Sequence, residues 1–276
     1  MAIDIDLLSR AYFCFDEPVK YTLKDKNTIY IHPFSVKNSE LFLSSVDVFT
    51  IDKNAMPSVE IIQMSYLDFI LEMALSNKSV MERFLFIMLN ALQVKELVKH
   101  EDSNGKSFLS VPELEAKITA QDFDDIKRII LYQNIVGYDD SYVNPEIKQA
   151  MEAYDSATNR NIVPPTLERK IAIITAHCGI SKKEQMDMTM RSHSLLFQEV
   201  VGEVEFTTSR AVALFSGEGS KIEHWIYPKK KDKYGKYFTD VDTYSDSMGG
   251  DKGAIKTTDG NISEAYQQMY DNFNRK

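Results

Sequence analysis

Residues 84–94 read Phe-Leu-Phe-Ile-Met-Leu-Asn-Ala-Leu-Gln-Val, a nearly unbroken run of apolar side chains. The run is about half as long as the ~20 residues that a membrane-spanning helix needs, and it contains the amides Asn90 and Gln93. Charged residues border it on both sides. It therefore predicts a helix that is buried on most faces in a globular core. We expect its buried side chains to include Leu85, Ile87, Met88 and Leu92.

Helix-start motifs occur on both sides of this run. In each one, a Ser, Thr or Asn side chain can accept a hydrogen bond from a backbone N–H in the first turn, and in most an acidic residue three positions later can return it. The motifs are Ser65–Asp68, Ser79–Glu82, Ser110–Glu113, Thr119–Asp122, Asn144–Pro145, Ser181–Glu184 and Thr189. They predict that the apolar helix begins at Ser79 and continues to about Lys99. Further helices are expected at 36–50, 166–178 and 190–204, with a last core helix at 207–215.

Residues 21–33 contain two short β-prone runs separated by Asp25-Lys26-Asn27, which suits a hairpin turn. Residues 221–227 could form a further short pairing. The expected fold class is therefore mainly α: a helical domain with a small N-terminal β-hairpin, followed by an extended linker and a C-terminal amphipathic helix. The expected segments are a hairpin plus helix at 1–55, a helical body at 56–216, an aromatic and Lys-rich docking segment at 217–238, a flexible linker at 239–261 and the C-terminal helix at 262–276.

The composition is that of an ordinary globular protein. The 276 residues carry 32 Lys and Arg against 41 Asp and Glu, a formal net charge of −9. This acidic balance argues against a protein that coats DNA or RNA, because such binding needs a basic surface. Cys14 and Cys178 lie far apart and form no Cys-x-x-Cys pair, which favours a reducing compartment such as the cytoplasm. The first residues do not read as a secretory signal.

No catalytic, metal-binding or cofactor-binding motif is apparent, so we expect no enzyme activity, no metal and no cofactor. Ser192-His193-Ser194 contains a nucleophile and a base, but neighbours on a helix face apart, and His193 is expected to be a surface or semi-buried histidine. The pairs Asp124-Asp125 and Asp139-Asp140 are interpreted as solvated charges rather than as an acid and a base.

Two segments near the C-terminus are candidate binding sites. Lys229, Lys230, Lys231, Lys233 and Lys236 are interleaved with aromatic residues and could contact single-stranded nucleic acid. The alternative is a solvated loop, which the net charge favours. His224 and Trp225 could either anchor this segment on the helical body or form the centre of a partner interface.

The last residues have the spacing of an amphipathic helix. Tyr266, Met269, Tyr270 and Phe273 fall at i, i+3, i+4 and i+7, so they share one face. A helix of about 12 residues is marginal alone in water and needs a surface on which to fold. That surface could belong to a partner or to the protein's own domain, and the sequence leaves both open.

Three segments resemble a known family. They are Ile118-Thr-Ala-Gln-Asp-Phe-Asp-Asp-Ile-Lys-Arg-Ile-Ile-Leu-Tyr-Gln-Asn134, Ile180-Ser-Lys-Lys-Glu-Gln-Met-Asp-Met-Thr-Met-Arg191 and Ile222-Glu-His-Trp-Ile226. Together with the opening hairpin and Pro33-Phe-Ser-Val-Lys37, they are similar to tail proteins of large contractile-tailed phages of Gram-positive hosts, described as baseplate hub assembly proteins or tail assembly chaperones. The resemblance extends over most of the chain up to about residue 238, and the family offers no catalytic residues to transfer.

The resemblance implies a role in virion assembly. Such a protein would bind other phage tail or baseplate proteins, or copies of itself, in the host cytoplasm. Three alternatives stay open: a structural component retained in the virion tail, a nucleic-acid-binding regulator that uses residues 229–238, and an enzyme with an unrecognised site. No membrane association is expected.

Overall fold

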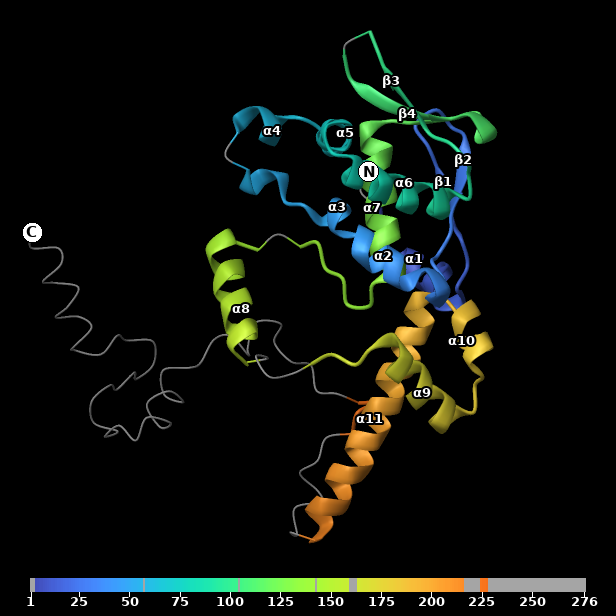
Figure 1. Ribbon diagram of the computed structural model, residues 1–276, viewed down its shortest axis with the longest axis vertical. Coiled ribbons are helices and arrows are strands. Elements are labelled where there is room, and N and C mark those ends of the chain that lie inside the picture. The colour runs from blue at the N-terminus through green and yellow to red at the C-terminus, as the bar shows by residue number, and fades with distance from the viewer. Residues whose placement is uncertain are drawn as a thin grey trace, which may run out of the picture. The chain divides into compact units, whose positions relative to one another are not determined.

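The computed structural model describes residues 3–56, 58–103, 105–141, 143–158, 163–215 and 224–227. The chain divides into two compact units, one made of Met1–Ser141 with Pro164–Ala211 and the other of Tyr142–Val163 with Val212–Lys276. The fold is mainly helical with a small N-terminal β-hairpin, as predicted (Figure 1). The expected linker at 239–261 and the C-terminal helix at 262–276 lie outside the described residues, as does most of the expected docking segment.

The N-terminal hairpin has the predicted position and turn. Strands β1 (Val19–Thr22) and β2 (Thr28–Ile31) pair antiparallel. The Asp25 carboxylate accepts a hydrogen bond from the Asn27 backbone N–H at 2.8 Å. Lys26 takes a left-handed backbone conformation with φ 70°, which reverses the chain.

Short helices precede and follow the hairpin along the chain. The segment predicted as one helix at 36–50 forms three consecutive short elements instead. In chain order, the helical elements up to residue 63 are α1 (Ile5–Ala11), η1 (Phe13–Phe15), η2 (Val36–Asn38), α2 (Ser39–Ser45), α3 (Asp47–Thr50), η3 (Lys53–Ala55) and α4 (Val59–Gln63).

Helices α5 (Tyr66–Ser76), α6 (Lys78–Leu92) and α7 (Ala120–Asn134) form the centre of the larger unit. The predicted caps of α5 and α7 are confirmed. The start of α6 was predicted at Ser79, but Asn77 is its cap and accepts the Ser79 N–H at 3.0 Å. Its predicted extension to Lys99 is also wrong, because Gln93 turns into the left-handed conformation with φ 57° and ends the helix.

A second sheet, which the sequence did not predict, follows α6. Strands β3 (Val98–Glu101), β4 (Ser107–Val111) and β5 (Ala116–Ile118) pair antiparallel in the order β3-β4-β5. The helix predicted to start at Ser110 does not form. Ser110 lies in β4, and the following Pro112–Leu114 is a single 3-10 turn, η4. Residues of β4 alternate between buried and half-buried, which is the period of a strand.

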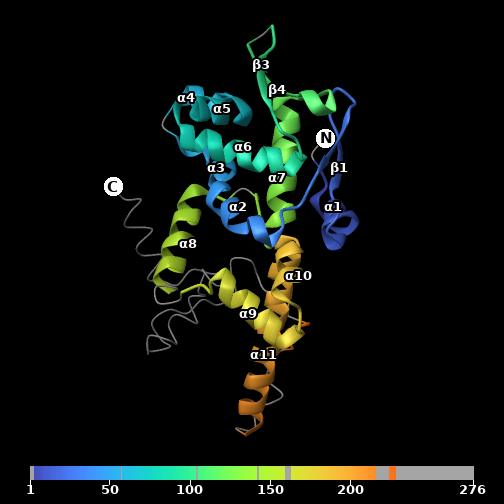
Figure 2. The ribbon, with the colours of Figure 1, turned by 45° about the vertical axis from the view of Figure 1, so that its right-hand side comes forward.

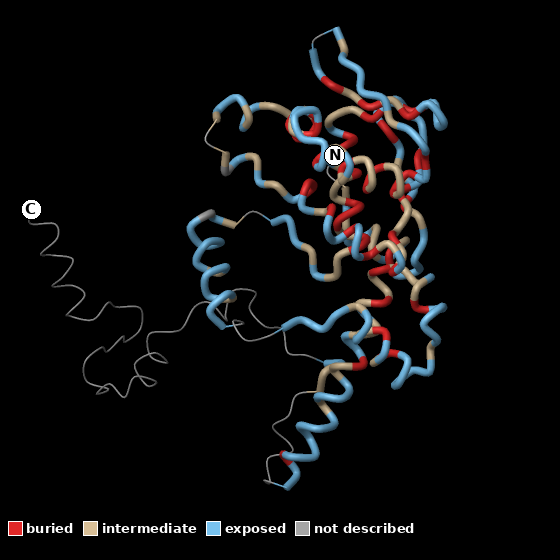
Figure 3. The backbone as a smooth tube through the Cα atoms, in the orientation of Figure 1, coloured by how far each residue is buried: buried red, intermediate tan, exposed pale blue. Residues whose placement is uncertain are grey.

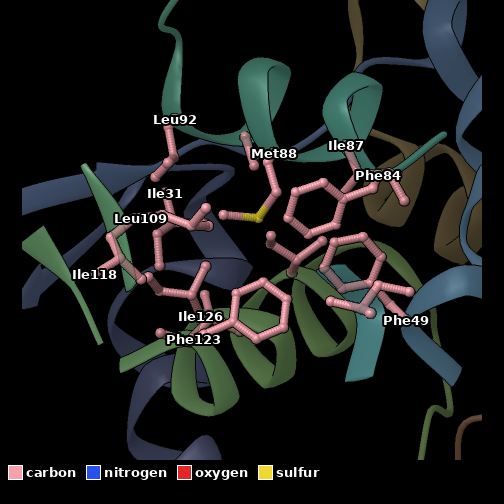
Figure 4. Packing of buried hydrophobic residues seen from close by; sticks show 14 of the residues in the cluster. Ile31, Phe49, Phe84, Ile87, Met88, Leu92, Leu109, Ile118, Phe123 and Ile126 are labelled. Atoms are coloured by element: carbon pink, nitrogen blue, oxygen red, sulfur yellow. The ribbon is translucent and has the colours of Figure 1, made fainter. Parts of the chain in front are cut away.

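One hydrophobic core joins both sheets to the central helices (Figure 4). The Phe84 ring of α6 lies 5.9 Å from Phe49 and 6.0 Å from Phe123 between ring centroids. As predicted, Ile87, Met88 and Leu92 are buried. Leu85 is only half-buried, because it follows core-facing Phe84 and its side chain therefore points about 100° away.

Asp122 fastens the hairpin to α7. Its buried carboxylate completes the capping box with Thr119 and also accepts the Lys24 backbone N–H at 3.1 Å. The Tyr21 hydroxyl donates to the neighbouring Asp125 carboxylate at 2.9 Å. Asp125 therefore has a structural partner, in addition to the solvent contact predicted for it.

The remaining helices begin where the sequence predicted. In the smaller unit, α8 (Pro145–Thr158) starts after Asn144, whose side chain accepts the Glu146 N–H at 2.9 Å. In the larger unit, α9 (Leu167–Cys178) ends at Gly179, and α10 (Lys182–Asp187) begins with the Ser181 capping box. The two helices predicted at 190–204 and 207–215 are one continuous helix, α11 (Met190–Phe215) (Figure 2).

Candidate protein-binding surface

The start of α11 is fixed to the core. Residues on either side of Thr189 form a short antiparallel bridge to the segment around Ser35, with Met190 N donating to Phe34 O at 2.8 Å. The Asp16 carboxylate accepts hydrogen bonds from the hydroxyls of Thr189 and Ser192. A negatively charged carboxylate near the N-terminus of a helix is also stabilised by the positive end of the helix dipole.

A buried polar pair connects α10 to α11. His193 is 3% exposed, so the prediction of a surface or semi-buried histidine is wrong. Its Nε2 lies 3.2 Å from the Gln185 Oε1. Burial, together with the charge of Lys170, lowers the pKa of His193. Ser192 points to Asp16 instead, so these two neighbours face apart as predicted and form no nucleophile–base pair.

Most of the far end of α11 is exposed, although Ala213 within it is buried (Figure 3). Its last five residues read Ala-Val-Ala-Leu-Phe. Val212 is 65% exposed, Leu214 66% and Phe215 95%. We call these three residues the α11 end surface. The expectation that 207–215 forms a core helix is therefore wrong for these side chains.

The composition of this turn makes it a candidate binding surface. A helix that is apolar on all sides is normally buried, and runs of exposed apolar residues on soluble proteins mark interaction sites. Burying one exposed Val, Leu or Phe side chain in an interface contributes about 1.5–3 kcal/mol of favourable free energy. The apolar run at 211–215 can be recognised in the sequence, because it follows a polar stretch at 207–210. Periodicity alone, however, does not tell whether such a run is buried in a core or exposed at an interface.

An open cleft of about 440 Å³ lies beside the start of α5. Lys127 Nζ sits 3.5 Å from the centroid of the Tyr66 ring, and the Tyr66 hydroxyl donates to Val48 O at 3.0 Å. Burial lowers the pKa of Lys127, and the charge of Asp124 opposes this shift. The cleft lining includes Ile51, Asp52, Lys53, Asn54, Met64, Ser65, Tyr66, Asp124 and Lys127.

This cleft is lined mainly by polar and charged residues. Two lysines and two aspartates balance each other among its described lining residues. The Ser65 hydroxyl caps α5 and lies 2.6 Å from the Asp68 carboxylate. The Ser65 hydroxyl is therefore used for helix capping. We assign this hydroxyl no catalytic role.

Asp140 is exposed, as expected for a solvated charge, but it also has structural partners. It pairs with Arg128 and accepts the Tyr132 hydroxyl at 2.6 Å. Burial acts to raise the pKa of Asp140, but the hydrogen bonds from Arg128 and Tyr132 outweigh it and lower the pKa. The cluster ties the loop after α7 back onto that helix.

Of the site residues expected from the sequence, His224 and Trp225 are described. Their rings stack with centroids 4.3 Å apart and an interplanar angle of 13°. The adjacent Tyr227 is 77% exposed. Whether Trp225 is an anchor or the centre of an interface stays a prediction. The other expected site residues, Lys229, Lys230, Lys231, Lys233, Lys236, Tyr266, Met269, Tyr270 and Phe273, lie outside the described residues.

No protein-family model, curated protein or solved structure matches this chain. Across the described ranges, no group of three or more His, Cys, Asp or Glu side chains is arranged to hold a metal ion. No helix in the described part of the chain is long and apolar enough to cross a membrane.

Proposed function

We propose that this protein is a non-enzymatic phage tail or baseplate assembly protein that acts by binding other proteins. The observation that carries the binding role is the α11 end surface, three large apolar side chains that are each about two-thirds exposed or more. The phage assignment is supported by the resemblance of residues 118–134, 180–191 and 222–226 to such tail proteins.

The partner is a tail or baseplate protein with an apolar groove. A helix end with a bulky aromatic residue, Phe215, suits helix-in-groove docking, in which a few apolar anchors supply most of the affinity. Such binding would cover the α11 end surface during assembly.

The test uses tagged full-length protein in cells that produce the phage. Leu214→Glu and Phe215→Glu place a charge in the α11 end surface, and Ser209→Glu places the same charge at an exposed polar position of the same helix. We expect identified tail or baseplate proteins to co-purify with the wild type and with Ser209→Glu, and to be lost with the other two variants. Recovery of no tail component, or equal recovery with all variants, would contradict the proposal.

A structural virion component is the second candidate, and the same resemblance supports it. Mass spectrometry of purified particles separates the two roles. Stoichiometric presence in the particle favours the structural component, whereas absence from the particle favours a transient assembly factor.

A further inference from the structure

The hairpin of β3 and β4 extends away from helices α4–α7 (Figures 1 and 2). All four residues of β3 are exposed, and β3 is at the edge of its sheet. Within the described part of the chain, no strand pairs with its outer edge. An edge strand presents unpaired backbone groups that can pair with another chain.

The register of the hairpin identifies which backbone groups face that open edge. Asp102 N donates to Lys106 O at 2.9 Å, so these opposed residues form a hydrogen-bonded pair. Hydrogen-bonded and non-hydrogen-bonded pairs alternate along an antiparallel ladder, which makes His100 bond to Phe108. The N–H and C=O groups of Lys99 and Glu101 therefore point outward, away from β4.

The side chains of these two residues carry opposite charges on one face. Lys99 Nζ lies 3.0 Å from the Glu101 carboxylate. In an antiparallel pairing of two copies centred on His100, Lys99 lies opposite Glu101 of the partner copy, and Glu101 lies opposite Lys99 of that copy. The arrangement forms four backbone hydrogen bonds and alternates charge both along and across the strands.

We propose that two copies of this protein associate through their β3 edges, with His100 facing its own symmetry mate, to form one six-stranded antiparallel sheet. A two-fold interface needs a self-complementary surface, and this edge has one. Shifting the register by two residues in one direction or the other places Lys99 opposite Lys99, or Glu101 opposite Glu101. Like charges directly opposed across strands are destabilising, so the charges select the register.

The outer face of the hairpin supports the same pairing. The His100 and Phe108 rings stack with centroids 5.3 Å apart, and Lys117 Nζ lies 3.8 Å from the Phe108 centroid. Pairing centred on His100 joins the two aromatic rows into one continuous surface. The contact is short, so we expect a reversible dimer rather than an obligate one.

The proposal is tested on the pure full-length protein by sedimentation velocity over a range of concentrations. We expect a concentration-dependent dimer that Lys99→Glu or Glu101→Lys weakens by about tenfold or more. The double variant Lys99→Glu/Glu101→Lys restores the opposite charges and should restore association. Lys20→Glu makes the same charge change as Lys99→Glu at an exposed position of β1 and should leave association unchanged.

Two further measurements locate the contact. Glu101→Pro removes an N–H that β4 does not use, so it should abolish the dimer while the melting temperature is retained. Amide exchange at Lys99 and Glu101 should slow as concentration rises. A monomer at every attainable concentration, or a dimer that tolerates both single charge reversals, would overturn the proposal. Because no phage component is present, this result is independent of the assembly role.

Discussion

His193 of α11 and Gln185 of α10 form a buried hydrogen bond, with Nε2 of His193 3.2 Å from Oε1 of Gln185. The Gln185 Nε2 group lies within hydrogen-bond distance of the carbonyls of Ile171 and Ile180, at 3.2 and 3.0 Å, and of the Thr175 hydroxyl, at 2.9 Å. The two carbonyls can only accept, which fixes the orientation of the amide. Gln185 Oε1 must therefore accept, and His193 must carry its proton on Nε2.

This pair predicts a loss of stability in mild acid. The pKa of His193 is lowered in the folded state by burial and by Lys170, and burial also lowers the pKa of His32. Below about pH 6.5 the unfolded chain binds more protons than the folded one, so the free energy of unfolding falls as pH decreases towards the lowered pKa values.

The variant His193→Gln keeps an N–H donor but does not titrate. Urea unfolding at steps between about pH 7 and about pH 5 should give a shallower pH dependence than the wild type. His32 is unchanged in both proteins and accounts for a residual slope. An identical slope in the variant would show that His193 is not the responsible group.

Burial along α6 predicts unequal costs for the same substitution. Leu92 is 3% exposed, so Leu92→Ala should lower the free energy of unfolding by about 2–5 kcal/mol through lost contacts and a cavity. Leu75→Ala on α5 removes the same atoms from a side chain that is 65% exposed and should cost less than about 1 kcal/mol. Half-buried Leu85 should fall between them. Equal costs measured by denaturant unfolding would contradict this packing.

Asp122 should be more important to stability than its neighbour Asp125. Asp122→Ala leaves the N–H groups of Lys24 and Thr119 without their acceptor, for an expected loss of about 1.5–3 kcal/mol. Asp125→Ala removes only the acceptor of the Tyr21 hydroxyl and should cost less. Thermal or urea unfolding of the two variants makes the comparison, and the reverse order would rule out this role for Asp122.

Asp16 should hold the start of α11 in place. Asp16→Asn keeps a residue that tolerates the left-handed conformation, φ 59°, but removes the charge that faces Thr189 and Ser192. We expect faster amide exchange at the start of α11 and unchanged exchange in α6. Asp6→Asn, at an exposed position of α1, is the control. Equal exchange in both variants and the wild type would remove Asp16 from this role.

The features that could be predicted from the sequence are those that depend on interactions between residues close together in the chain. The caps at Ser65, Thr119 and Ser181, the stop at Gly179 and the β1–β2 turn all depend on residues within a few positions of each other. The hydrogen bonds concerned form wherever the local backbone forms. Helix starts and the hairpin were therefore predicted correctly at these places.

The sequence by itself determined a mainly helical chain, its hairpin and most helix starts, because those rest on local hydrogen bonds and periodicity. Only the tertiary structure decided that Ser110 belongs to a strand, since β4 needs β3 and β5 to pair with it. Only the tertiary structure buried His193 against Gln185 and left Phe215 exposed, although both residues lie on α11. Burial depends on what packs against a side chain, and those neighbours lie elsewhere in the sequence or on another molecule.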